Sequence, residues 1–157
     1  MTAAARWPAD AAAIARLIPH QGRMCLLDAV LDCSAAQIRC RATSHCRADH
    51  PLRDADGALP ASAAIEYAAQ AMALHGALNA KPGVNGQPGF LASARGVRLQ
   101  VPRLDEIDGD LIVQAEHLAG DERQAMYRFA LHDAGGRCLV EGRATVVLDT
   151  PLETAPR

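Results

Sequence analysis

Apolar and polar residues alternate along several stretches of the chain. Residues 125–132 read AMYRFALH, which places Tyr127, Phe129 and Leu131 on one face and more polar side chains on the other. Residues 37–44, QIRCRATS, alternate in the same way. A period of two predicts half-buried β-strands. Four further strand-like stretches are predicted at residues 24–30, 89–101, 111–118 and 138–148.

One long stretch breaks this alternation. Residues 58–80 read ALPASAAIEYAAQAMALHGALNA and contain a single charged residue, Glu66. Pro60 suits the first turn of a helix, and Asn79, Pro82 and Gly83 are stop signals, so a helix is predicted over residues 60–78. A long helix with almost no charge is a buried helix. Its many alanines allow a sheet to pack close to the helix backbone.

The predicted order is therefore two strands, one long helix and four strands, preceded by a short helix at residues 9–17. Strands in hairpin succession indicate an antiparallel sheet and an α+β fold. A length of 157 residues suits a single domain, with its core at about residues 18–148 and a frayed tail from Thr150. One small sheet covers one side of a helix, so dimerisation is expected to cover the remaining apolar surface.

Composition excludes several classes of function. A net charge of −2 and few aromatic residues argue against nucleic-acid binding. No segment has the roughly 20 unbroken apolar residues of a membrane span, and the first residues lack the apolar run of a signal peptide. The five cysteines have neither disulfide nor zinc-site spacing and are interpreted as small buried hydrophobic residues in a reducing cytoplasm: Cys25, Cys33, Cys40, Cys46 and Cys138.

Glu66 is the chemically conspicuous residue. An ionised carboxylate inside a buried helix is costly unless it is paired, hydrogen-bonded or protonated. Glu66 is therefore either a structural residue, hydrogen-bonded to Gln70 one turn later or to a neighbouring strand, or a residue kept for chemistry. No glycine-rich nucleotide loop is present, and Ser62 does not lie in a nucleophile elbow.

Two motifs resemble a known family, the hot-dog dehydratases that act on 3-hydroxyacyl groups carried by acyl carrier protein. Residues 18–28, IPHQGRMCLLD, resemble the family opening I-P-H-R-x-P-M-L-L-L-D. Residues 60–70 resemble the family stretch P-G-x-x-x-x-E followed by A-x-A-Q, with Pro60 and Ala61 at P-G, Glu66 at the acid and EYAAQ at residues 66–70. The resemblance spans about residues 18–148 and is nearest to the divergent branch found in aryl-polyene-type gene clusters.

The chain departs from the family pattern in the loop before the helix. The family histidine lies eight residues before the helix proline, where this chain has Leu52, and the nearest histidine is His50. The loop is two residues longer than the family loop, and Ala61 replaces the glycine whose N–H is assigned to the substrate carbonyl. A backbone donor survives the change from glycine to alanine only if φ stays negative.

The resemblance implies a hot-dog fold and a cytoplasmic dehydratase without a cofactor or metal. Dehydration needs a base, an acid and a donor to the enolate-like oxygen. The implied base is His50, the implied acid is Glu66 kept protonated by desolvation, and the N–H of Ala61 or Ser62 binds the thioester oxygen. Gln70 orients Glu66 or satisfies the core, and His20 makes structural hydrogen bonds. The acidic loop at residues 105–110 is expected to be a solvated turn.

The implied partners are acyl carrier protein, which bears the substrate, and a second subunit, either a copy of the chain or a paralogue. In family-like geometry His50 and Glu66 of one site come from different subunits. Two other functions stay open on the residues alone. One is hydrolysis of an acyl thioester on the same fold, and the other is a non-catalytic subunit of a heterodimeric dehydratase.

Overall fold

A computed structural model describes residues 6–80 and 89–148 of the chain. It contains a short helix α1 (Ala11–Ala15), a long helix α2 (Ala64–Leu78) and six strands. The strands are β1 (Ala29–Cys33), β2 (Gln37–Ala42), β3 (Gly89–Leu99), β4 (Leu111–Gly120), β5 (Gln124–His132) and β6 (Cys138–Leu148). Pro82, Gly83 and the tail from Thr150, which carry sequence predictions, lie outside the described residues.

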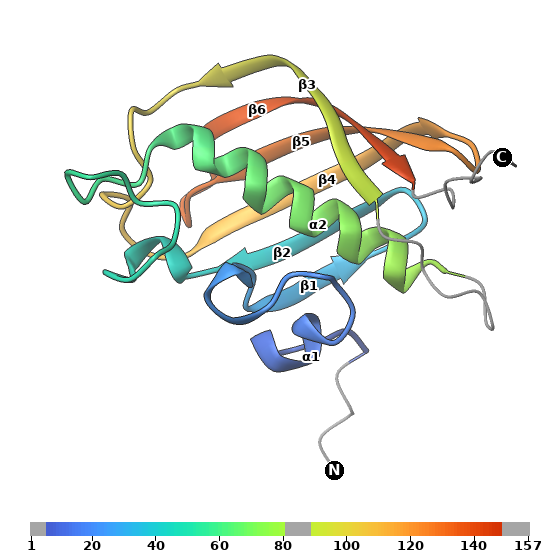
Figure 1. Cartoon of the computed structure of the whole chain (residues 1–157), viewed down its shortest axis with the longest axis horizontal. Helices are drawn as coiled ribbons and strands as arrows, with labels where there is room; N and C mark the ends of the chain where they lie inside the picture. Colours follow the sequence, from blue (N-terminus) through green and yellow to red (C-terminus); the bar gives the residue numbers. More distant parts are fainter. Residues whose placement is uncertain (1–5, 81–88, 149–157) are drawn as a thin grey trace, which may run out of the picture.

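The six strands form one antiparallel sheet in the order β1-β2-β4-β5-β6-β3 (Figure 1). Strand β3 follows the helix in sequence but pairs with β6, so it forms one edge of the sheet, and β1 forms the other. The α+β class, the antiparallel sheet and the four strands after the helix are confirmed.

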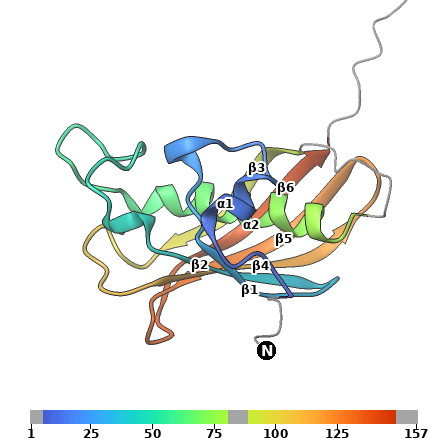
Figure 2. The ribbon, with the colours of Figure 1, turned by 90° about the horizontal axis from the view of Figure 1, so that it is seen from below.

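Helix α2 lies along one face of the sheet, as both views show (Figures 1 and 2). Tyr67, Ala68, Ala71 and Leu74 are fully buried, and Met72 is nearly so. These side chains belong to a single core together with inward residues of the strands and of the segment that follows α1. The predicted buried helix is therefore confirmed, and its alanines permit the close packing of helix on sheet.

Two predicted boundaries are wrong, for local reasons. The helix proper begins at Ala64, because Pro60 is extended and a 3₁₀ turn (Ala61–Ala63) precedes it. The strand predicted at residues 24–30 begins only at Ala29. Gly22 has a positive φ of 59° and opens a 3₁₀ turn (Gly22–Met24). The Met24 carbonyl and the Leu26 amide then bond to the Gln70 side chain of α2 instead of to the sheet.

The cysteine prediction holds for three of the five residues. Cys25, Cys33 and Cys40 are buried, whereas Cys46 is exposed and Cys138 is half-buried. All five are free thiols. No helix among the described residues is long and apolar enough to cross a membrane.

Candidate active site at the start of helix α2

Glu66 lies in the first turn of α2 and contacts two side chains through one of its oxygens. Nε2 of His20 is 3.0 Å from Oε1, and Nε2 of Gln70 donates to the same oxygen at 3.1 Å. Among the described residues, Oε2 has no polar partner. Glu66 is 30% exposed and His20 is 23% exposed. Of the two carboxylate oxygens, Oε1 thus has two hydrogen-bond partners, and Oε2 is left for a ligand.

Gln70 is fully buried and connects Glu66 to the opening segment of the chain. Its Oε1 accepts from the Leu26 amide at 2.9 Å, and its Nε2 donates to the Met24 carbonyl at 2.6 Å as well as to Glu66. From the sequence, Gln70 either orients Glu66 or satisfies buried polar groups of the core, and the structure combines these two roles. The residue satisfies a buried backbone segment and orients the carboxyl group at the same time.

Desolvation does not dominate the pKa of Glu66 in the single chain. The His20 ring beside it, more than the opposing desolvation, holds the pKa of Glu66 below its ordinary value, and the Gln70 hydrogen bond lowers it further. Desolvation alone would raise the pKa, as the sequence argument assumed. The His20 contact is not predicted from the sequence, because His20 lies 46 positions before Glu66.

His50 is 4% exposed and belongs to a separate hydrogen-bonded chain. Its Nε2 lies 3.0 Å from the hydroxyl of Tyr67, which lies 2.6 Å from Oγ of Ser44. Ser44 in turn donates to the Leu26 carbonyl at 2.8 Å. Since the one hydroxyl proton of Ser44 goes to Leu26, Tyr67 donates to Ser44 and accepts from His50.

This chain of donors fixes the tautomer of His50. Nε2 carries the proton that Tyr67 accepts, and Nδ1 accepts the Leu52 amide at 3.1 Å. Burial, assisted by the charges of Arg47 and Arg53, lowers the pKa of His50 below its ordinary value. His50 is therefore a neutral imidazole whose only basic lone pair is occupied by a backbone N–H.

Within one chain the structure does not bring His50 and Glu66 into contact. Glu66 is bonded to His20 and Gln70, whereas His50 is bonded to Tyr67 and Leu52. Glu66 and Tyr67 are consecutive residues of α2, so their side chains leave the helix about 100° apart. A common site for His50 and Glu66 stays a prediction that involves a second subunit.

The backbone donors at the helix start differ in availability. The Ala61 amide donates to the Pro102 carbonyl at 3.1 Å, within a bridge between Pro60 and Arg103. Among the described residues, the Ser62 amide has no backbone hydrogen bond outside the helix itself, and Ser62 is an exposed residue. None of the described non-glycine residues has a positive φ, so Ala61 keeps the backbone that the glycine-to-alanine change requires. Ser62 is the better placed of the two predicted donors.

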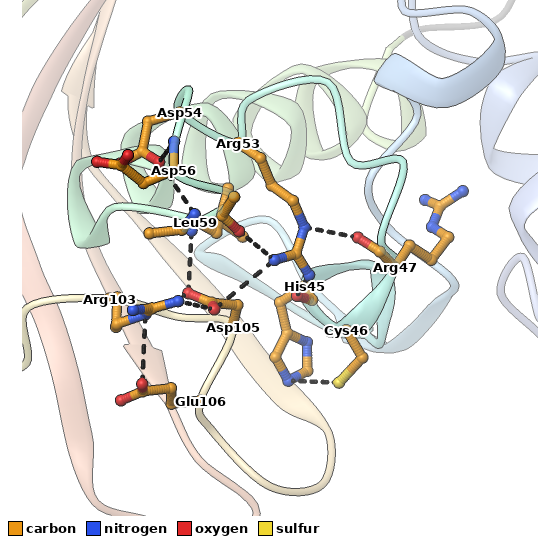
Figure 3. A network of polar contacts seen from close by, with 12 residues as sticks. His45, Cys46, Arg47, Arg53, Asp54, Asp56, Leu59, Arg103, Asp105 and Glu106 are labelled. Atoms are coloured by element: carbon orange, nitrogen blue, oxygen red, sulfur yellow. Dashed lines mark hydrogen bonds and ion pairs between the residues drawn. The ribbon is translucent and has the colours of Figure 1, made fainter.

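A polar network fixes the loop that leads into α2 (Figure 3). The Arg53 guanidinium donates to the carbonyls of His45, Arg47 and Gly57. It also lies 3.6 Å from Oδ2 of Asp105. Arg53 therefore binds three backbone carbonyls of residues 45–57 and ties this segment to the connection between β3 and β4.

Asp105 is the anionic centre of this network. Its carboxylate accepts from the Leu59 amide at 2.9 Å and from Nε of Arg103 at 2.9 Å, and its side chain is 9% exposed. The Arg103 guanidinium holds the pKa of Asp105 well below its usual range. The prediction of a solvated acidic turn is thus wrong for Asp105, because two arginines and a backbone amide surround it.

We expect Asp105→Asn to destabilise the protein by about 2 kcal/mol at pH 7, the usual loss for a hydrogen-bonded charge. A carboxyl whose pKa is depressed by folding stabilises the protein above its unfolded-state pKa of about 4 and loses that contribution as pH falls through the folded-state value. The difference between wild type and variant should therefore shrink below about pH 4. Urea unfolding at pH 7 and pH 3 measures it, and an equal difference at both values would contradict the role of the charge.

His20 is the site residue to which sequence reasoning gave no role beyond structural hydrogen bonds. The sequence feature that could have indicated this role is the position of His20 in the opening motif, four residues before Met24, where the segment bound by Gln70 begins. That segment packs on α2, and its preceding histidine reaches Glu66. The pairing depends on a tertiary contact that no local periodicity predicts.

Comparisons with known proteins agree with this fold. A family model described as ApeP-like, ApeP dehydratase, matches residues 12–155. The structure of the dehydratase heterocomplex ApeI:P from Xenorhabdus doucetiae is similar, with 28% sequence identity, a TM-score of 0.74 and coverage of 89% of this chain and 93% of that one. No curated protein sequence matches the chain significantly.

More distant structures share the fold alone. Zebrafish thioesterase superfamily member 2 has 17% identity and a TM-score of 0.62, covering 88% of this chain and 93% of that one. A hypothetical thioesterase from Streptococcus pneumoniae, solved with coenzyme A, has 9% identity and a TM-score of 0.56, covering 76% and 84%. The hot-dog fold expected from the sequence is confirmed. Because the family model covers most of the chain, the chain belongs to the ApeP-like dehydratase family.

Proposed function

We propose that the chain is a dehydratase subunit that converts a 3-hydroxyacyl thioester, carried on acyl carrier protein, into the trans-2-enoyl thioester. The observation that carries the proposal is Glu66, a carboxyl group at the start of the central helix with one oxygen held and the other open. Membership of a dehydratase family supports the reaction class. The carrier protein rests on the resemblance of the two sequence motifs.

The geometry of Glu66 suits a general acid. Oε1 faces two N–H groups, so a proton on the carboxyl group belongs on Oε2, the open oxygen. In the elimination, a base removes the proton next to the thioester carbonyl, the electron pair forms the carbon–carbon double bond, and the bond to the 3-hydroxyl breaks. Glu66 gives its proton to that oxygen, which leaves as water. Because the pKa of Glu66 is lowered in the single chain, this role requires that burial at a subunit interface raise the pKa until the carboxyl group is protonated. The amide of Ser62, an exposed residue at the helix start, is the proposed donor to the carbonyl oxygen.

His50 is the proposed base, and its surroundings set a condition on that role. Its lone pair at Nδ1 is held by the Leu52 amide, and its Nε2 proton by Tyr67. Before His50 can accept a substrate proton, the Leu52 amide has to stop donating to Nδ1. We propose that substrate binding at a subunit interface provides this release, with His50 and Glu66 of one site coming from two subunits.

Strand β3 supports association with a second hot-dog subunit. It is an edge strand paired with β6 alone among the described strands, and it exposes Phe90 by 63% and Leu99 by 51%. Unpaired edges with exposed apolar side chains favour pairing with another chain. We propose that β3 lies at the dimer interface, with a paralogue as one candidate partner because the similar Xenorhabdus doucetiae structure is a heterocomplex.

We expect the purified chain to be a dimer at micromolar concentration and Phe90→Glu to weaken the dimer, because the change places a charge on the exposed edge. Light scattering measures both states. Leu31→Glu is the matched control, since Leu31 is also an exposed apolar residue but lies on β1 at the opposite edge. Equal effects of the two variants, or a wild-type monomer, would count against an interface at β3.

A second candidate function is that of a non-catalytic subunit which completes the site of a paralogue. The occupied lone pair and deep burial of His50 favour it, because a histidine locked in this way supplies no base. The distant thioesterase structures do not favour hydrolysis, since they show the fold alone. Product analysis separates the three functions. An enoyl thioester indicates a dehydratase, and a free thiol indicates a hydrolase. A product that forms only with a second subunit, and that is unaffected by Glu66→Gln in this chain, indicates the accessory role.

A further inference from the structure

His20 and Gln70 contact the same oxygen of Glu66, although they belong to two segments that lie far apart in the sequence. Gln70 lies one turn later on α2, and His20 lies in the segment between α1 and the first 3₁₀ turn. Their contacts of 3.1 Å and 3.0 Å both end on Oε1. Two donors on one oxygen fix the rotation of a carboxyl group and leave the other oxygen for a ligand.

The second ring nitrogen of His20 determines where its proton lies. Nδ1 is buried and has no hydrogen-bond partner among the described residues. A proton on Nδ1 would be a buried donor without an acceptor, which is costlier than leaving the same nitrogen as a bare lone pair. The ring proton is therefore placed on Nε2, where it meets Glu66.

We propose that His20 is a positioning residue for Glu66, which, together with Gln70, holds Oε1 and leaves Oε2 free for the 3-hydroxyl of the substrate. This inference rests on the proposed function, because it assigns His20 a task in that same site. His20 itself does not touch the reacting atoms. It acts by orienting the acid and by stabilising the carboxylate that remains once the proton has been transferred.

His20 and Gln70 differ in burial, and this difference decides which of them can be replaced without disturbing the fold. Gln70 is fully buried and also binds the Leu26 amide and the Met24 carbonyl, so its replacement would disturb the packing of the opening segment on α2. His20 is partly exposed, and its only polar contact among the described side chains is with Glu66. His20 is thus the donor that can be changed with little effect on the fold.

The test compares His20→Ala and His20→Gln, in which glutamine retains an N–H donor. Glutamate carboxyls labelled with ¹³C are titrated by NMR, and the Glu66 signal is assigned by its absence in Glu66→Gln. We expect His20→Ala to raise the pKa of Glu66, because the His20 ring is the largest influence that lowers it. No other charged side chain among the described residues is within ion-pair distance of Glu66.

In the dehydratase assay, His20→Ala should lower kcat by about 10- to 100-fold with little change in KM, the range expected for one lost hydrogen bond to a charged group. The limb of the pH–rate profile that reports Glu66 should move to higher pH. His20→Gln should recover part of kcat. A role of His20 in folding alone would lower the thermal midpoint without moving the Glu66 titration.

The outcomes separate this inference from the proposed function. If the Glu66 titration is the same in wild type and His20→Ala, the contact does not operate in solution and the inference fails whatever the activity. If the titration moves but kcat does not, His20 has no positioning role. If the titration moves and wild type has no dehydratase activity, the proposed function has failed, and the inference falls with it although the contact is real.

Discussion

Replacing Glu66 with glutamine should lower dehydratase turnover by about 10²- to 10⁴-fold, the typical loss for an acid–base group. Glutamine has almost the same shape, but its amide cannot deliver a proton to the leaving hydroxyl. Its carbonyl oxygen can still accept from His20 and Gln70, the two groups that contact Oε1. The fold should therefore be retained, and circular dichroism with a thermal melt checks this point.

Glu122→Gln is the matched control, because Glu122 is an exposed carboxylate in the turn between β4 and β5, and its loss should leave turnover unchanged. The steady-state rate on a 3-hydroxyacyl thioester is the measurement for both variants. Full activity of a folded Glu66→Gln protein would show that Glu66 is a structural partner of His20 and Gln70 and no more.

His50→Ala is expected to cause a loss of similar size, about 10²- to 10⁴-fold, if His50 is the base. Because alanine also removes the bonds to Tyr67 and Leu52, His50→Asn serves as a second variant that keeps an acceptor for the Leu52 amide but has no group that titrates near neutral pH. His132→Ala is the control for the loss of a histidine outside the site.

Mixing the two inactive variants tests whether the site is shared between subunits. If His50 of one chain meets Glu66 of its partner in a symmetric dimer, a dimer of Glu66→Gln with His50→Ala retains one intact site. An equimolar, re-equilibrated mixture should then recover about a quarter of wild-type activity, since half of the dimers are mixed and each has one of its two sites intact. No recovery, in a mixture shown to exchange subunits, would contradict a shared site.

A different pattern would assign the base to another residue. If Glu66→Gln is inactive while His50→Asn is fully active, His50 is a structural residue that holds the loop through Tyr67 and Leu52, and another group is the base. The lowered pKa of His50 and its hydrogen bonds to Tyr67 and Leu52 are the reasons to test this outcome.

The parts of the fold that the sequence predicted well are those with a local cause. Strands β2 and β5 follow from alternation with a period of two, and α2 follows from an alanine-rich run whose single charged residue is Glu66. The segment before β1 was predicted less well, because Gln70 holds the backbone of Met24 and Leu26 against the helix and keeps it out of the sheet. That bond spans more than 40 residues, and no local pattern encodes it.

The same distinction applies to the site. Glu66 stood out in the sequence because a single charge in a buried helix needs an explanation, and Gln70 followed from its position one turn later. The His20 contact, the Tyr67 bond to His50 and the arginines around Asp105 are tertiary pairings between distant segments. They change the expected protonation of Glu66 and the availability of His50, the two properties on which the mechanism depends.

The dehydratase function is tested most directly by mass-spectrometric analysis of the product that the purified chain forms from a 3-hydroxyacyl group on acyl carrier protein, at a concentration where the dimer persists. We expect the carrier-bound acyl group to lose one molecule of water, and Glu66→Gln nearly to abolish this change. Release of the free carrier thiol, or an unchanged substrate in the presence of folded wild-type dimer, would contradict it.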